Sequence, residues 1–127
     1  MAWTVDPRSD VPPSRQLEQA VLDAIATGEL APGAQLPSVR AMAATALVNH
    51  NTVARAYLEL ERCGAVEGQN GRGVFVTAAG VAIARKARQG TTLDAFARAA
   101  SAALRAGHAP EKLLEILQRE RKSRRSA

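Results

Sequence analysis

The sequence predicts a mainly helical fold with one small β-hairpin, and three features of the chain predict it. Between Leu36 and Gly64, apolar residues recur twice with the i, i+3, i+4, i+7 spacing of a helix face. An Asn70-Gly71 pair between two short apolar runs is the strongest short-range signal for a hairpin. Hydrophobic residues make up 46% of the chain but aromatic residues only 3%, so the core must be built from Ala, Leu, Val and Ile, which favours closely packed helices.

Length and composition limit what the chain can be. At 127 residues it is long enough for one small domain and an appended segment. Its single cysteine excludes an intramolecular disulfide, and it shows neither a signal peptide nor an apolar run of the ~20 residues that span a bilayer. We therefore expect a cytoplasmic protein with no membrane partner.

The charge is distributed unevenly along the chain. The whole chain has a net charge of +5, but residues 1–79 hold six arginines, no lysine and eight carboxylates, which gives them a net charge of −2. Residues 80–127 hold eleven Lys or Arg and four carboxylates, which gives them +7. A basic balance favours polyanionic partners, yet the helix pair between residues 36 and 64 does not lie in the basic half. The helix pattern is therefore given more weight than the overall charge.

The first 27 residues predict an arm followed by a helix. Three prolines and no periodicity occur in residues 1–13, so we expect an extended, partly mobile arm over residues 1–12, anchored to some surface by Trp3. A helix is predicted from Ser14 to Thr27 and is ended by Gly28. Its inner face carries Leu17, Val21, Ala24 and Ile25.

Residues 36–64 predict two short helices joined by a tight turn. Ser38 is a suitable N-cap for the first helix and Asn49 for the second, and Gly64 suits the left-handed position after the second. Two short amphipathic helices in this order form a helix-turn-helix, whose second helix is the one presented to a DNA major groove. The inner positions are Val39, Met42, Ala43, Ala46, Val53, Ala56, Tyr57 and Leu60.

A hairpin is predicted directly after the helix pair. Residues 65–67 and 74–77 are short β-like runs separated by a glycine-rich turn, and Gln35-Leu36 suits a very short strand. Helix, helix-turn-helix and hairpin in this order make a winged helix, with the hairpin as its wing. We assign this winged-helix domain to residues 13–78.

Residues 79–127 are predicted to form a helical hairpin that serves dimerisation. Thr91-Thr92 fits the N-cap of a helix that ends at Gly107, and Pro110 fits the first turn of a second helix. Residues 80–90 are compatible with either a further helical turn or a linker. Two helices joined by a short loop cannot bury both faces alone, so a second copy is expected to cover the remaining apolar surface. Ile116 is predicted to lie on the inner face of the helix that starts at Pro110. The expected dimerisation residues are Leu93, Phe96, Ala97, Ala100, Leu104, Leu113, Leu114 and Leu117.

Residues from about Pro13 to Val76 resemble the DNA-binding domain of the GntR family of bacterial transcription regulators. The resemblance is carried by residues 28–40 (GELAPGAQLPSVR), residues 48–57 (VNHNTVARAY), Leu60-Glu61, Gly64 and residues 71–76 (GRGVFV). It covers about half of the chain, and the short helical tail is similar to that of the YtrA-like subfamily, in which the tail serves dimerisation. The resemblance implies a homodimeric regulator, a repressor, that binds an inverted-repeat operator.

Six side chains are candidates for DNA binding: Arg40, His50, Asn51, Thr52, Arg55 and Arg72. Three of them occupy the first turn of the second helix, the part of a recognition helix that reaches base edges. Asn pairs with adenine and Arg with guanine, while Thr52 and the backbone N–H groups of that turn suit a phosphate. Arg40 resembles a DNA-contacting arginine of the family, and Arg72 at the wing tip suits a minor groove or a phosphate.

Several of these positions have a simpler structural interpretation. Arg55 is also compatible with a solvated surface arginine, and Arg40 with an ion pair that braces the turn. We expect Arg62 to be simply exposed, Leu58 to pack on the wing or meet a thymine methyl, and Cys63 to be a small buried residue.

Sequence-specific DNA binding is the leading function. The alternative is a winged helix that binds proteins, with a basic tail that binds polyanions without sequence preference. An enzyme is not indicated, because His50 and His108 lie in different units and no Cys/His/carboxylate set has metal-ligand spacing. We therefore expect no cofactor and no metal. The expected partners are a double-stranded DNA operator, a second copy of the chain and an unidentified small-molecule effector.

Overall fold

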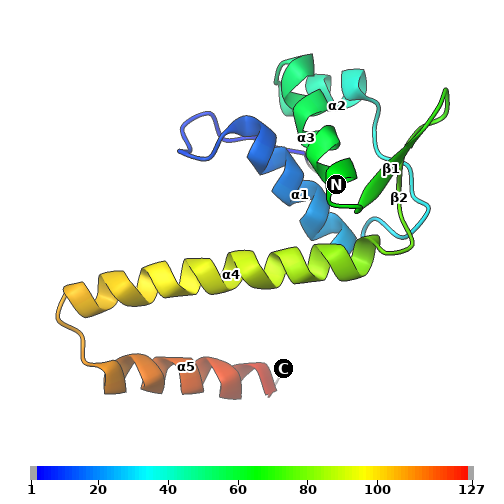
Figure 1. Cartoon of the computed structure of the whole chain (residues 1–127). Helices are drawn as coiled ribbons and strands as arrows, with labels where there is room; N and C mark the ends of the chain where they lie inside the picture. The colour runs from blue at the N-terminus through cyan, green and yellow to red at the C-terminus, as the bar shows by residue number, and fades with distance from the viewer. Residues whose placement is uncertain (1–2, 126–127) are drawn as a thin grey trace. The chain divides into compact units, whose positions relative to one another are not determined.

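The computed structural model describes residues 3–125, and these are mainly helical with one two-stranded antiparallel sheet (Figure 1). The elements follow the order α1 Pro13–Thr27, α2 Val39–Ala46, α3 His50–Arg62, β1 Val66–Gln69, β2 Gly73–Val76, α4 Gly80–Arg105 and α5 Pro110–Arg125. The predicted fold class, a mainly helical chain with a small β wing, is confirmed. No helix in this described part of the chain is long and apolar enough to cross a membrane.

The chain divides into two compact units, and the boundary between Gln89 and Gly90 lies inside α4. Residues 80–90, for which the sequence left a choice, are therefore helical. The predicted helix start at Thr91-Thr92 is wrong, because both threonines lie in the interior of α4. The Ala-, Lys- and Arg-rich stretch before them has high helix propensity, so the helix begins at Gly80 and continues through the threonines.

The N-terminal arm is fixed to α1. The Gln16 side-chain amide donates to the carbonyls of Asp6 (3.0 Å) and Val11 (2.8 Å), and its oxygen accepts from the Asp6 N–H (2.8 Å). Trp3 is only 7% exposed and belongs to the core of its own chain. From Trp3 onward the arm is therefore ordered, which corrects the expectation of a mobile arm.

Both predicted helix caps of the helix-turn-helix are formed. The Ser38 hydroxyl accepts from the Ala41 N–H at 3.1 Å, and the Asn49 side-chain oxygen accepts from the Asn51 N–H at 2.7 Å. Such caps satisfy backbone donors that lack a partner within the helix. Leu47, the last cap of α2, has a left-handed φ of 56° and a side chain that is 89% exposed.

The core of the first unit is formed as the periodicities predicted. The inner face of α3 packs against α1, α2 and β1. Cys63, in contrast, is exposed at the C-cap of α3, so its expected burial is wrong. The buried positions predicted for α1, α2 and α3 are Leu17, Val21, Ala24, Ile25, Met42, Ala43, Ala46, Val53, Ala56, Tyr57 and Leu60.

The hairpin is stitched to the segment that precedes α2. Val66 pairs with Val76 and Gln69 with Gly73, while Gly71 and Gly73 take φ values of 72° and 122° that favour glycine. Leu36 N–H donates to the Val74 carbonyl at 2.8 Å, and Gln35 forms a bridge with Phe75. The short strand predicted at Gln35-Leu36 is therefore present as an isolated bridge along β2.

One partly buried hydrogen bond connects α3 to the loop before α2. The Tyr57 hydroxyl donates to the Pro37 carbonyl at 2.7 Å, and the residue is only 6% exposed. Burial disfavours the phenolate and raises the pKa of Tyr57 from 10 to about 12. The bond fixes the middle of α3 against the segment that introduces α2.

Tyr57 is the only tyrosine, so the ultraviolet absorbance of tyrosinate reports on this group alone. We expect a titration midpoint near 12 in the folded chain and near 10 in urea-unfolded chain. Because the unfolded chain loses this proton more readily, Tyr57 should lower the free energy of unfolding as the pH rises from about 10 to about 12. A folded-state midpoint near 10 would contradict the burial of the Tyr57 phenol, and Tyr57→Phe should abolish the signal.

Candidate nucleic-acid interface

The burial of one side of α3 turns its opposite side to solvent. Asn51, Arg55, Leu58 and Arg62 recur at i, i+4, i+7 and i+11, so they form one stripe along the helix. All four are exposed. Leu58 is 48% exposed. This stripe begins at the N-terminal turn, which is the part of a recognition helix that reaches base edges.

The N-terminal turn of α3 presents side chains rather than free backbone donors. The Asn49 carbonyl accepts from the backbone N–H groups of Thr52 (3.0 Å) and Val53 (3.4 Å). The Asn49 side-chain oxygen accepts from the backbone N–H of Asn51. His50 and Asn51 are exposed and Thr52 is half-buried. The backbone N–H groups of Asn51, Thr52 and Val53 already have partners. An anion at this turn would therefore be bound by the side chains and the helix dipole.

Two further arginines come from elements next to α3. Arg40 is the second residue of α2 and is exposed, and within residues 3–125 no carboxylate pairs with it. The ion pair considered for Arg40 is therefore not formed. Arg72 lies in the turn between β1 and β2, where its N–H donates to the Gln69 carbonyl at 2.9 Å and its side chain is exposed.

The six candidate side chains share a lack of partners in the described part of the chain. Arg40, His50, Asn51, Thr52, Arg55 and Arg72 make no side-chain hydrogen bond or ion pair there. Arg62, on the same stripe as Arg55, instead pairs with Glu59 at 2.9 Å. The exposure expected for Arg62 is present, but its charge is partly compensated by that carboxylate.

The helix-turn-helix is locally positive although the first 79 residues have a net charge of −2. Residues 37–58 contain Arg40 and Arg55 and no carboxylate. Glu59, the first carboxylate after them, pairs with Arg62, and Glu61 accepts a hydrogen bond from the Gly68 N–H at 3.1 Å. Five of the eight carboxylates lie in residues 1–30, outside this pair of helices. The negative balance is therefore carried mainly by segments other than the candidate reading surface.

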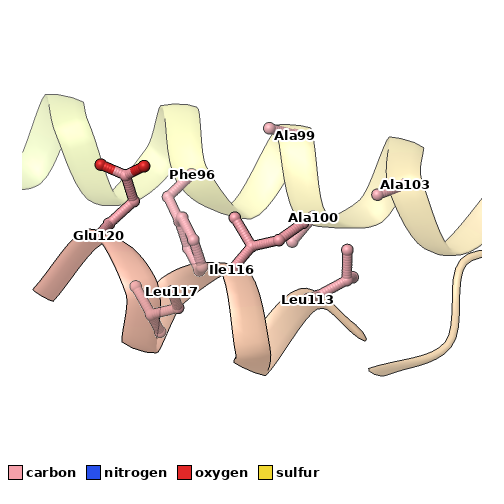
Figure 2. A pocket seen from close by; sticks show the side chains of 8 residues that line it. All are labelled: Phe96, Ala99, Ala100, Ala103, Leu113, Ile116, Leu117 and Glu120. Atoms are coloured by element: carbon pink, nitrogen blue, oxygen red, sulfur yellow. The ribbon is translucent and has the colours of Figure 1, made fainter. Parts of the chain in front are cut away.

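In the second unit, α4 and α5 enclose an apolar groove of about 350 Å³ (Figure 2). Of the expected dimerisation residues, Phe96, Ala100, Leu113 and Leu117 line it. Leu93, Ala97, Leu104 and Leu114 do not line it and are exposed. The remaining lining residues are Ala99, Ala103, Ile116 and Glu120.

The inner face of α4 is thus rotated relative to the predicted stripe. Ala99 and Ala103 follow Phe96 at i+3 and i+7, so the spacing that places them in the groove was present in the sequence. The larger Leu93 and Leu104 favoured a different stripe. Phe96 remains 56% exposed and Leu117 48% exposed, so the two helices cover their apolar surface only in part.

Comparison with known proteins identifies relatives of the first unit. The family model described as bacterial regulatory proteins, gntR family, matches residues 13–76. The HTH-type transcriptional repressor YtrA of Bacillus subtilis is 42% identical over 73 residues, which cover 58% of this chain and 56% of that protein. The matched part therefore spans about half the length of such curated relatives.

Two solved structures share the fold over most of the chain. A transcriptional regulator from Oenococcus oeni matches with a TM-score of 0.73 and 28% identity over 90% of this chain and 94% of that one. YtrA from Sulfolobus acidocaldarius, a GntR-family transcription factor, matches with a TM-score of 0.60 and 31% identity over 76% of this chain and 99% of that one. The likeness to these structures extends beyond the winged helix.

Proposed function

Since the chain belongs to the gntR family of bacterial regulatory proteins, we propose that it is a sequence-specific DNA-binding transcription regulator. The observation that supports this most strongly is the exposed stripe of α3, which starts at a capped N-terminus and carries unpaired polar side chains. On the same stripe, Arg62 is paired with Glu59 at 2.9 Å. Asn51 and Arg55 lack such partners within residues 3–125, so they are available to a ligand.

In this proposal, α3 enters the major groove and the neighbouring elements bind the backbone. Arg55 would read a guanine and Asn51 an adenine, because these are the base edges that their side chains match. Arg40, Thr52 and Arg72 would bind phosphates or, for Arg72, the minor groove. His50 would contact the groove edge from the first turn. The phosphate contacts would supply most of the affinity and would make it sensitive to salt, because each of them releases counterions from the DNA.

We propose that the active form is a homodimer and that the second unit provides its interface. The apolar side chains that α4 and α5 leave exposed are the surface that a second copy would cover, with the eight expected dimerisation residues contributing to it. In domain terms, an arm over residues 1–12 and a winged helix over residues 13–78 are followed by a dimerisation tail over residues 79–127. Two recognition helices related by a two-fold axis would read an inverted repeat.

The action proposed for the dimer is repression in the cytoplasm. Bacillus subtilis YtrA is a transcriptional repressor, and this chain is 42% identical to it over 73 residues. A dimer that occupies an operator within a promoter would exclude the transcription machinery. The alternative, a protein-binding winged helix with a polyanion-binding tail, differs in a measurable way because it requires no preferred DNA sequence.

The proposed function predicts that the full chain enriches one sequence from a pool of randomised DNA duplexes. The enriched sequence should be an inverted repeat with half-sites about one helical turn apart, because a two-fold dimer presents two α3 helices. Affinity for it should exceed that for a scrambled duplex by at least about 1,000-fold. Equal binding to both duplexes would favour the polyanion-binding alternative, and a single unrepeated site would contradict the dimer.

Arg55 and Arg62 offer a matched pair on the same stripe of α3. Arg55→Ala should weaken binding to the enriched duplex by about 1–3 kcal/mol and relax the preference at one base pair of each half-site. Arg62→Ala should change the affinity by less than about 0.5 kcal/mol, since Arg62 lies at the far end of the helix and pairs with Glu59. Fluorescence anisotropy with single-base variants of the duplex measures both effects. Equal losses for the two variants would contradict the assignment of Arg55.

A further inference from the structure

We infer that Gln35 and Glu61 are positioning residues that hold the wing at a fixed place relative to α3, so that Arg72 and the recognition helix engage one duplex together. This inference rests on the proposed DNA binding and deepens it. Neither residue belongs to the reading surface described above. Both connect the helix-turn-helix region to the hairpin, Gln35 at the turn between its strands and Glu61 on β1.

The first connection comes from the segment that precedes α2. The Gln35 side-chain amide donates to the backbone carbonyl of Arg72 at 2.9 Å, across 37 residues of sequence. Gln35 also forms the bridge with Phe75, so its backbone lies against β2 while its side chain reaches the turn. Gln35 therefore holds the backbone of Arg72, and the guanidinium of Arg72 is the candidate DNA contact of the wing.

The wing is shaped to admit this side chain. Gly73 follows Arg72 directly, and a Cβ built on it would lie 2.5 Å from the Gln35 amide nitrogen. Its φ of 122° disfavours any other residue as well. A side chain at position 73 would therefore displace Gln35 and break its bond to the wing tip.

The second connection comes from the recognition helix itself. The Glu61 carboxylate, in the last turn of α3, accepts from the Gly68 N–H on β1 at 3.1 Å. A Cβ on Gly68 would lie 3.3 Å from that carboxylate oxygen, so the approach is close. A carboxylate that accepts a backbone N–H makes a charge-assisted hydrogen bond, which is stronger than a neutral one.

The hairpin needs such connections because it is small. β1 and β2 have four residues each, and an isolated two-stranded hairpin is at best marginally stable in water. Val66 and Val76 bury its base in the core, but the residues from Glu67 to Gly73 are exposed. Gln35 on the tip and Glu61 on β1 therefore restrain the part of the wing that the core does not. Because the backbone at Arg72 is already restrained, the wing loses less conformational freedom when Arg72 binds DNA, which raises affinity.

Substitutions of Glu61 separate the hydrogen bond from the charge. Glu61→Gln and Glu61→Ala both remove the negative charge, but only Gln keeps an acceptor oxygen for the Gly68 N–H. On the duplex enriched from the random pool, Glu61→Ala should bind about 3- to 10-fold more weakly than Glu61→Gln. Equal affinities for these two variants would overturn the role of Glu61.

A double-mutant cycle tests whether Gln35 acts through Arg72. Gln35→Ala should weaken binding to the same duplex about 3- to 10-fold and lower the salt dependence of the affinity, as Arg72→Ala does. In the Arg72→Ala background, Gln35→Ala should cost less than about 2-fold, because the group that it positions is gone. Gln69→Ala, on the same hairpin, is the control for loss of an exposed glutamine and should show no such coupling to Arg72.

The possible outcomes distinguish a failure of the proposed DNA binding from a failure of the positioning role of Gln35. If the full chain enriches no sequence, the proposed DNA binding itself fails. If it does enrich one, and Gln35→Ala costs the same with and without Arg72, the DNA binding stands and the positioning role of Gln35 is overturned. A loss that disappears in the Arg72→Ala background supports the inference, since a general loss of stability would affect both backgrounds alike.

Discussion

The burial of one face of α3 is the constraint on which the rest of the structure depends. Val53, Ala56, Tyr57 and Leu60 each occupy the core between α1, α2 and β1, and together they fix the rotation of the helix about its axis. The Tyr57 bond to the Pro37 carbonyl adds a directional restraint to this non-directional packing. Because the helix cannot rotate, the side chains on its other face are the ones that the protein presents to a ligand.

The proposed DNA binding also has to be reconciled with the low net charge of the winged helix. Bulk charge would have pointed to the basic tail, since residues 80–127 carry +7 and residues 1–79 carry −2. The local charge differs from the bulk charge: the helix pair has no carboxylate from residue 37 to 58, and the next two, Glu59 and Glu61, are bonded to Arg62 and to the Gly68 N–H. A few unpaired groups at defined positions then favour discrimination between sequences over non-specific affinity.

Much of the fold follows from local signals that the sequence carries openly. The periodicities of α1, α2 and α3, the caps Ser38 and Asn49 and the Asn70-Gly71 turn each depend on neighbours within a few residues. What the sequence could not reveal depends on tertiary contacts. Trp3 packs into a core whose other members are distant in sequence, and the Gln35 and Glu61 bonds join segments that only the folded chain brings together.

In α4 and α5, the local signals predict the helices but neither the start of α4 nor its inner face. Strong propensity before Thr91 extends α4 through the expected cap, and small alanines rather than the larger leucines face α5. Periodicity identifies an apolar stripe only when one stripe is clearly more apolar than its neighbours, and in this alanine-rich helix several are similar. The exposed side of α3 follows more directly from the sequence, because the opposite side of that helix is clearly apolar.

In the proposed function the winged helix, and not the basic tail, reads DNA. The most direct test is an amide NMR titration of the full chain with the duplex enriched from the random pool. We predict that the resonances of residues 49–55 on α3 and 71–73 on the wing shift most, while those of residues 119–125 on α5 change little at moderate salt. Shifts confined to α5, with the α3 and wing resonances unchanged, would contradict the account.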